Sequence, residues 1–165
     1  QWDPDGTLLV QVESRDQKSL RLLRGDPKTG AVTPLLEDRS ETWINLHDDL
    51  RPLKDGRLLW SSEASGFRHL ELRARDGSRL RALTSGDWPV DQVEGIDEKN
   101  GLVYFTAAKD GPMERQLYRV SLEGGPIERM TCSNRSAAVA SARIRSVSTV
   151  ASRCSTSPTP QNSVR

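Results

Sequence analysis

The chain has 165 residues, of which 35% are hydrophobic, so its length allows one folded domain or a part of a larger one. The formal net charge at pH 7 is only +1, which by itself indicates no particular class of partner. No run approaches the roughly 20 apolar residues that a membrane-spanning helix needs, so the sequence predicts no membrane span. The first residues contain neither an initiator Met nor a leader pattern, and we therefore expect an internal fragment.

Charge is distributed unevenly along the chain. All 23 acidic residues and 19 of the 24 basic residues lie within residues 1–131, which gives this segment a net charge of −4. Residues 132–165 carry a charge of +5 and contain no aromatic residue. Proteins that bind nucleic acids combine positive charge with aromatic side chains that stack on bases, so we expect no nucleic-acid partner.

The segment 132–165 is a low-complexity Arg/Ser tail for which the sequence predicts no fold. It contains nine Ser and five Arg, but no acidic residue, Gly or aromatic residue. Two explanations fit this composition: an out-of-frame reading of GC-rich coding DNA, which we favour, and a disordered linker. Either explanation places the domain boundary at residue 131.

Residues 1–131 are expected to form short strands that are separated by tight turns. Dipeptides such as Asp5-Gly6, Asp55-Gly56 and Asn100-Gly101 tolerate positive φ and close hairpins between antiparallel strands. Between these turns, runs of β-branched and apolar residues predict ten strands. In chain order these are 7–13, 18–24, 31–36, 57–62, 67–74, 79–84, 90–96, 102–108, 116–122 and 127–131.

The predicted strands recur at a long and nearly constant period. Leu20, Leu70 and Leu117 are spaced by 50 and 47 residues, and the Thr that closes a unit recurs after 47 residues, from Thr84 to Thr131. In detail, segment 59–62 matches 104–107, and 69–72 matches 116–119. A period of about 45 to 50 residues with four strands per unit is typical of a β-propeller blade. We therefore predict an all-β partial propeller of between two and three four-stranded antiparallel blades, with a β-sandwich as the alternative.

Three strings carry a resemblance to a known family. They are residues 43–51, 54–63 and 65–70, which include Ser-Ser-Glu-Ala-Ser-Gly-Phe-Arg-His-Leu from Ser61 to Leu70. These strings resemble the N-terminal propeller of dipeptidyl peptidase IV and its bacterial relatives, within the prolyl oligopeptidase family of serine peptidases. The resemblance covers residues 1–131 and does not extend through the tail.

The resemblance implies a non-catalytic part of a larger enzyme. In this family an eight-bladed propeller caps an α/β-hydrolase domain, screens peptides by size, and the enzyme cleaves after a penultimate Pro or Ala. No Gly-x-Ser-x-Gly nucleophile elbow occurs in the sequence, so we expect no catalytic residue and an inactive chain. We expect no cofactor, a peptide partner only together with a hydrolase domain, and a homodimer in the full-length family. A periplasmic, envelope-associated or secreted location is also implied by the resemblance.

Two other functions remain open from the sequence. A propeller-repeat module that binds protein partners, without an attached peptidase, would have the same strands and turns. An inactive remnant of a pseudogene would also retain them. The coding DNA downstream of the propeller distinguishes these two alternatives from the peptidase, because only the peptidase requires a nucleophile elbow there.

Candidate site residues fall into two groups. Trp43 and Arg51 are expected to lie close to substrate, because they belong to the segment that runs from one blade into the next. The others are predicted to hold the blades together: Glu63 forms a charge-assisted link with Arg68 or His69 across a turn, and Phe67 packs between blades. This structural group comprises Trp60, Glu63, Phe67, Arg68, His69, Trp88 and Tyr118.

The run His47-Asp48-Asp49 has the residue types that bind zinc or iron. Adjacent residues on one loop rarely converge on a single ion, so we interpret this run as a polar loop between blades and predict no metal site. Trp2, Trp60 and Trp88 are spaced as packing residues between blades.

Overall fold

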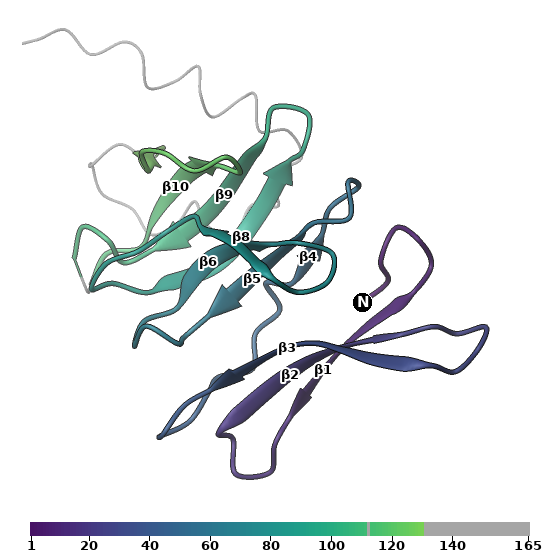
Figure 1. Ribbon diagram of the computed structural model, residues 1–165. Coiled ribbons are helices and arrows are strands. Elements are labelled where there is room, and N and C mark those ends of the chain that lie inside the picture. Colours follow the sequence, from purple (N-terminus) through teal and green to yellow (C-terminus); the bar gives the residue numbers. More distant parts are fainter. Residues whose placement is uncertain (112, 131–165) are drawn as a thin grey trace, which may run out of the picture.

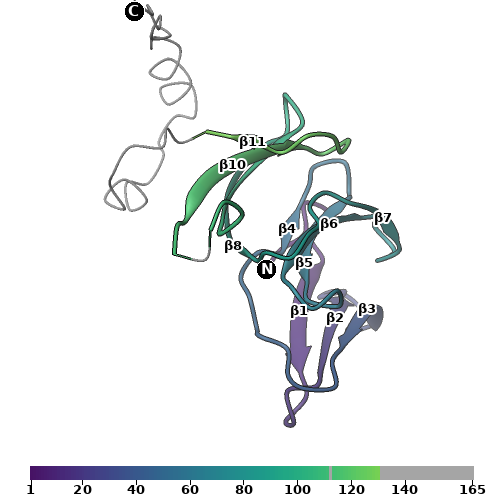
Figure 2. The ribbon, with the colours of Figure 1, turned by 90° about the vertical axis from the view of Figure 1, so that its left-hand side faces the viewer.

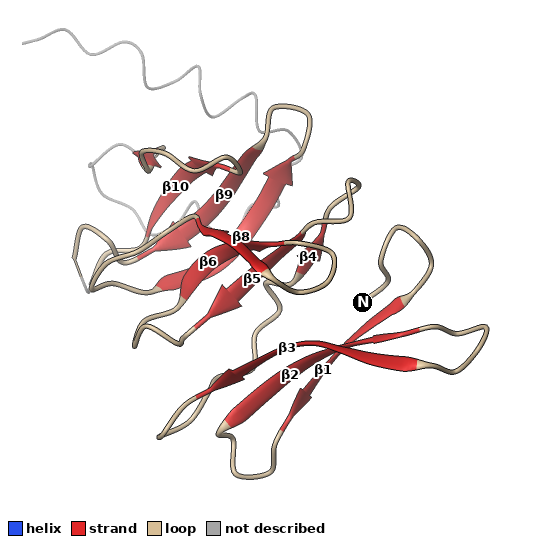
Figure 3. Ribbon diagram, viewed as in Figure 1, coloured by secondary structure: helices blue, strands red, loops and turns tan. Residues whose placement is uncertain are grey.

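The structure is a computed structural model that describes residues 1–111 and 113–130. The predicted tail, residues 132–165, lies outside the described residues. The described part contains strands and no helix (Figure 3), and hence no helix that could cross a membrane. Its strands are β1 (Leu8–Glu13), β2 (Ser19–Gly25), β3 (Val32–Arg39), β4 (Arg51–Pro52), β5 (Leu58–Ser62), β6 (His69–Arg73), β7 (Arg79–Ala82), β8 (Val90–Asp97), β9 (Leu102–Ala107), β10 (Gln116–Ser121) and β11 (Glu128–Arg129).

The strands form three antiparallel sheets that succeed one another in chain order (Figure 1). The first sheet has the order β1-β2-β3, the second β4-β5-β6-β7 and the third β8-β9-β10-β11. Each strand pairs with its neighbour in sequence, as in the blades of a propeller. The predicted partial β-propeller is therefore confirmed, and the three successive sheets do not form the two facing layers of a sandwich.

All ten predicted strands are present, with ends that differ by a few residues. Their turns are built as expected, because Gly6, Gly56 and Gly101 all have positive φ. The sequence analysis missed β4, which has only two residues and includes Pro52. A strand this short leaves no alternation of apolar and polar residues to recognise.

The register of the strands tests the repeat. Leu59 pairs with Leu72, and Tyr104 pairs with Arg119, so the predicted match between the second and third units is confirmed. In the first sheet, however, Gln11 pairs with Leu22, whereas its counterpart Ser61 pairs with Leu70. Leu22, not Leu20, is therefore the structural counterpart of Leu70, because the β1–β2 hairpin is one residue pair longer.

Residues 1–3 occupy in the first sheet the place that β4 and its turn occupy in the second. The N–H of Leu9 donates to the carbonyl of Gln1 at 2.7 Å, and Trp2 forms a bridge with Leu8. The next turn has the same two hydrogen bonds in both sheets: Asp3 and Gly6 match Leu53 and Gly56. Trp2 itself is 62% exposed, so the expectation that it packs between blades is wrong.

The hydrophobic core lies between the sheets rather than within one of them. One cluster joins the first and second sheets through residues such as Leu9, Leu22, Leu58 and Trp60. A second cluster joins the second and third sheets and includes Leu72, Val93, Phe105 and Tyr118. Figure 2 shows the second sheet between the other two. Each blade therefore depends on its neighbour for burial of its apolar side chains.

Tyr118 lies in the second cluster and stacks on Phe105, with ring centroids 5.8 Å apart. Burial, and secondarily the Asp110 carboxylate, raise the pKa of Tyr118 to about 12. The unfolded chain loses this proton near pH 10, so the stability from neutral Tyr118 is present below pH 10 and is lost as pH rises towards 12.

We expect the free energy of unfolding to fall by about 1.4 kcal/mol per pH unit above pH 10 on account of this group. Urea unfolding at pH 9, 10 and 11 measures the slope. The Tyr118→Phe variant keeps the stacked ring and should show a shallower slope. Equal slopes in the two proteins would contradict the prediction.

Candidate functional site

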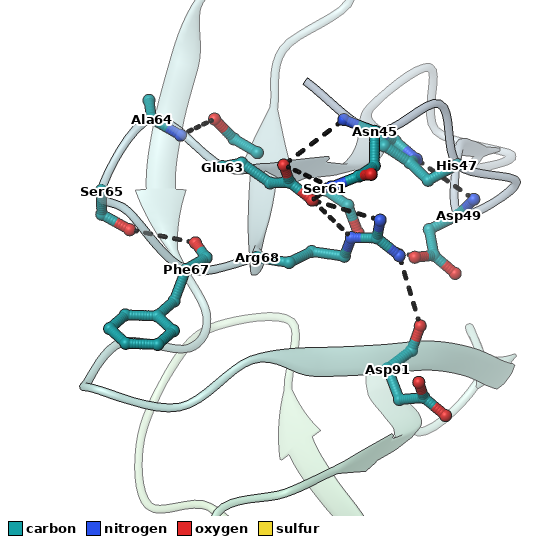
Figure 4. Close-up of polar contacts among 11 residues, drawn as sticks. Asn45, His47, Asp49, Ser61, Glu63, Ala64, Ser65, Phe67, Arg68 and Asp91 are labelled. Carbon is teal, nitrogen blue, oxygen red and sulfur yellow. Dashed lines mark hydrogen bonds and ion pairs between the residues drawn. The ribbon is translucent and has the colours of Figure 1, made fainter. Parts of the chain in front are cut away.

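The segment between β3 and β4 carries one buried carboxylate, that of Asp49 (Figure 4), which links the second and third sheets. Asp49 is 3% exposed, and its Oδ1 accepts a hydrogen bond from the N–H of Val93 on β8 at 2.8 Å. Its Oδ2 accepts one from the hydroxyl of Ser61 on β5 at 3.1 Å. A buried carboxylate is stable only where such donors surround it, so Asp49 fixes the inner strand of the third sheet against the second.

His47 lies next to this carboxylate and is also buried. Its Nδ1 accepts a hydrogen bond from the N–H of Asp49 at 3.4 Å, and its ring meets Trp60 edge to face at 4.8 Å. Burial lowers the pKa of His47, which favours the neutral ring at pH 7. His47 and Asp49 thus point inward, and only Asp48 fits the solvent-exposed polar loop that the sequence predicted.

Replacing Asp49 with alanine is expected to lower the free energy of unfolding by about 2–3 kcal/mol, because the buried N–H of Val93 loses its acceptor. Asp49→Asn retains one oxygen for Val93 and an amide that can donate to Ser61, so it should lose less than about 1 kcal/mol. Asp48→Ala is the matched exposed control, and urea unfolding followed by circular dichroism measures all three. Equal stability of Asp49→Ala and Asp48→Ala would refute this role.

Glu63 holds the β5–β6 turn against the segment that precedes β4. Its carboxylate accepts hydrogen bonds from the side chain and backbone of Asn45 at 3.1–3.4 Å. The Nε and Nη2 of Arg68 also donate to Glu63, both at 3.2 Å. Nη1 of Arg68 reaches the carbonyl of Asp91 at 3.5 Å. The structure therefore places Arg68, and not His69, against Glu63.

His69 instead closes the second sheet against the loop after β7. Its Nδ1 lies 3.1 Å from the hydroxyl of Thr84, and its Nε2 lies 2.8 Å from the carbonyl of Gly86. Trp88 packs edge to face on the same ring at 5.1 Å. His69 lies opposite Ser62 in the register of β5 and β6, but both of its ring nitrogens already bond to Thr84 and Gly86. This histidine is therefore not available as a base for Ser62.

Trp43 and Arg51, the two residues expected near substrate, line different cavities. Trp43 is 61% exposed and lines a cavity of about 460 Å³ at the junction of the second and third sheets. We call it the junction groove and define it by Trp43, Phe67, Arg68, Pro89 and Asp91. Phe67 is 38% exposed, so its side chain lies at the surface and not in the packing between blades that the sequence predicted.

Arg51 lies on the innermost strand of the second sheet and lines a second cavity of about 390 Å³. We call it the inner-strand cavity and define it by Gln11, Asp48, Leu50 and Arg51. Nη1 of Arg51 donates to the carbonyl of Leu50 at 2.9 Å and to that of Asp48. These bonds hold the guanidinium at the wall and leave its Nε and Nη2 without a bond to the described residues, free to donate to a ligand.

Metal ligands do not converge at either cavity within the part of the chain that the structure describes. Among residues 1–111 and 113–130, no three His, Cys, Asp or Glu side chains lie close enough to hold a metal ion. The sequence analysis did not identify Asn45 or Asp49 as residues that fix this region. In the sequence, Asn45 and Asp49 appear only as polar residues of a segment that links two sheets. Polar residues in such segments are usually exposed, so nothing in the sequence marks these two as buried or bonded.

Three meandering antiparallel sheets with cores between them define the blades of a β-propeller. The chain belongs to the dipeptidyl peptidase IV (DPP IV) N-terminal region family, whose model matches residues 1–161. The family resemblance seen in the sequence is thereby confirmed. The matched segment extends past residue 131, where the sequence analysis placed the domain boundary. That boundary stays a prediction.

Relatives of known sequence and structure agree with this family. The chain is 48% identical over 146 residues to a probable dipeptidyl-aminopeptidase B of Coccidioides posadasii, an alignment that covers 77% of the chain and 15% of the relative. It is 31% identical over 159 residues to human dipeptidyl peptidase 8, covering 75% and 18%. The structure of Porphyromonas gingivalis dipeptidyl peptidase 4 matches with a TM-score of 0.70 and 25% identity, over 76% of the chain and 18% of that protein.

The chain thus spans less than a fifth of the length of these relatives. The bacterial origin suggested by the resemblance is not confirmed: the two similar sequences named above come from a fungus and from human, and the similar structure comes from Porphyromonas gingivalis.

Proposed function

We propose that this chain forms part of the wall along which peptides approach the hydrolase domain of a dipeptidyl aminopeptidase that cleaves after a penultimate Pro or Ala. The observation that carries the proposal is Arg51 on the innermost strand of the second sheet, beside the inner-strand cavity. Inner strands line the central channel of a propeller. The names of the relatives, dipeptidyl-aminopeptidase B and dipeptidyl peptidase 8, support the reaction class.

In this proposal Arg51 binds peptide and takes no part in bond cleavage. Its Nη1 is anchored on the carbonyls of Asp48 and Leu50, so the guanidinium is held in place before a ligand arrives. The remaining N–H groups present a positive charge to peptide carbonyl oxygens or to a carboxylate. Hydrolysis itself would depend on residues of another domain.

The first test is to sequence the coding DNA across and beyond the Thr131 codon and to translate all three forward frames. The proposal expects further blades and then a Gly-x-Ser-x-Gly elbow, with Asp and His downstream, in one of the frames. Further blades followed by a stop codon would favour the protein-binding module instead. Frames that contain neither would favour the inactive remnant.

The second test is kinetic and uses the protein that joins this segment to its hydrolase domain. Arg51→Ala is expected to lower kcat/KM for peptide substrates about tenfold, because one hydrogen bond to a charged group is lost. Arg21→Ala, on the exposed surface of β2, is the matched control and should leave kcat/KM unchanged. Equal effects of the two substitutions would refute a substrate contact at Arg51, and circular dichroism verifies that both variants are folded.

A further inference from the structure

The junction groove is separate from the inner-strand cavity and has a different chemical character. Three segments far apart in the sequence form it: the linker before β4, the β5–β6 turn and the beginning of β8. They contribute Trp43, then Phe67 and Arg68, then Pro89 and Asp91. Because these segments come from two sheets, the groove exists only where the blades are packed together.

Two aromatic side chains stand exposed on this groove. Trp43 is 61% exposed and Phe67 is 38% exposed, and Pro89 adds a third apolar ring to the lining. Large apolar side chains that converge on one groove mark a site of interaction, in contrast to single exposed ones scattered over a surface. Tryptophan in particular supplies much binding energy per residue at interfaces.

The charged groups of the groove are paired within the protein. Glu63 is neutralised by Arg68 at 3.2 Å, and Asp91 by Arg115 at 3.3 Å. The Glu63 carboxylate also accepts hydrogen bonds from Asn45, so it has little capacity for a donor on a ligand. The groove therefore favours a neutral ligand over a cation or an anion.

The groove also offers hydrogen-bond donors on two of its large side chains, Arg68 and Trp43. Arg68 has five N–H groups, of which two make no hydrogen bond to the part of the chain that the structure describes. The indole N–H of Trp43 likewise has no partner among residues 1–111 and 113–130. Two hydrogen bonds to Glu63 orient the guanidinium, so less entropy is lost when it donates to a ligand.

From these features we infer that the junction groove binds an extended peptide segment that contains proline. A proline ring stacks on aromatic side chains, and the carbonyl before it accepts a hydrogen bond while proline brings no N–H that needs an acceptor. Such segments adopt the polyproline II conformation before binding, which lowers the entropic cost. This site takes peptide without cleaving it, and it does not depend on Arg51 or on an attached hydrolase.

The test is a titration of the full chain, labelled with ¹⁵N, with an acetylated and amidated decapeptide of alternating alanine and proline. The four tryptophans give four indole N–H signals, so binding is read at single side chains. We expect the Trp43 signal to shift in a saturable way, and the Trp60 signal, which is bonded to Asp38, to stay in place. A control decapeptide of the same length, with alanine and glycine in place of proline, should shift neither signal.

Variants separate binding from folding. Trp43→Ala and Phe67→Ala should raise the dissociation constant for the proline peptide at least tenfold, and Trp43→Phe should raise it less. Trp2→Ala, which removes an indole of similar exposure outside the groove, should leave the affinity unchanged. These side chains are exposed, so the dispersed spectra of all four variants should be retained.

Three results would overturn the inference. The first is an equal shift with the proline peptide and the control peptide, and the second is an equal loss of affinity in Trp2→Ala and Trp43→Ala. The third is a shift of the Trp43 signal by a neutral oligosaccharide such as cellotetraose when neither peptide shifts it, which would assign the groove to sugars. The readout is independent of peptidase activity, so its failure is distinguishable from failure of the function proposed above.

Discussion

Replacing Gly77 with alanine is expected to destabilise the chain by about 3 kcal/mol. Gly77 closes the turn between β6 and β7 with φ +87°, a conformation that alanine adopts only at a cost. A Cβ at this position would also lie 2.1 Å from the carbonyl oxygen of Leu35. Backbone of the first or second sheet would have to move to relieve the overlap, because no flexible side chain can give way.

The close approach has a local cause in the first sheet. The register between β2 and β3 shifts, since Leu22 pairs with Leu36 while Leu23 pairs with Pro34. Leu35 is therefore the additional residue of a β-bulge, and its carbonyl comes close to Gly77 of the neighbouring sheet. The glycine is thus required by packing between two blades as well as by its own turn.

Gly6→Ala is the matched control, because Gly6 closes another Asp-Gly turn with φ +85° and a Cβ there would meet nothing within 4 Å. It should lose about 1 kcal/mol for the positive φ alone. Urea unfolding followed by circular dichroism measures both variants. A loss at Gly77 no larger than that at Gly6 would show that the contact with Leu35 does not constrain the blades.

Replacing Trp60 with alanine is expected to cost about 3–5 kcal/mol, since its side chain is completely buried between the first and second sheets. The indole N–H donates to Oδ2 of Asp38 on β3 at 3.0 Å. Alanine leaves a cavity and removes a donor from a buried carboxylate at the same time. Loss of this one side chain should therefore weaken the packing of the first sheet on the second.

Two further variants separate these effects. Trp60→Phe retains most of the ring volume but no N–H, and it should lose about 1–2 kcal/mol. Trp2→Ala removes an indole that is 62% exposed and should lose less than about 0.5 kcal/mol. Thermal unfolding followed by circular dichroism ranks the three proteins. If Trp60→Ala and Trp2→Ala melted at the same temperature, Trp60 would not be the packing residue that its burial indicates.

The sequence was sufficient to predict the local structure and the family. Strand and turn positions depend on neighbouring residues, since Asp-Gly and Asn-Gly pairs close hairpins and alternation of apolar residues marks strands such as β2. The spacing between repeats then identifies the blade, because each unit must supply the same strands and turns. The string from Ser61 to Leu70 added the family resemblance, which the family match over residues 1–161 confirms.

The candidate site was predicted only in part. Glu63 and Arg68 meet across a short turn, so their link is a consequence of sequence proximity. Trp43 and Arg51 were each expected to lie near substrate, which stays a prediction, and the structure places them in two different cavities. Trp43 lies in the linker before β4 and Arg51 lies on β4 itself, and between them Asp49 is fixed by Ser61 and Val93, which lie 12 and 44 residues away in the sequence.

By itself the sequence determined ten of the eleven described strands, the hairpin turns, the blade repeat and the family, because local propensity and periodicity specify these features. Only the tertiary structure decided which polar and aromatic side chains are buried. The sequence predicts that His47 and Asp49 belong to an exposed polar loop, but both side chains are buried. Phe67 and Trp43, in contrast, are exposed on the junction groove. Burial at these positions depends on how one sheet packs against the next, and contacts between distant segments of the chain set that packing.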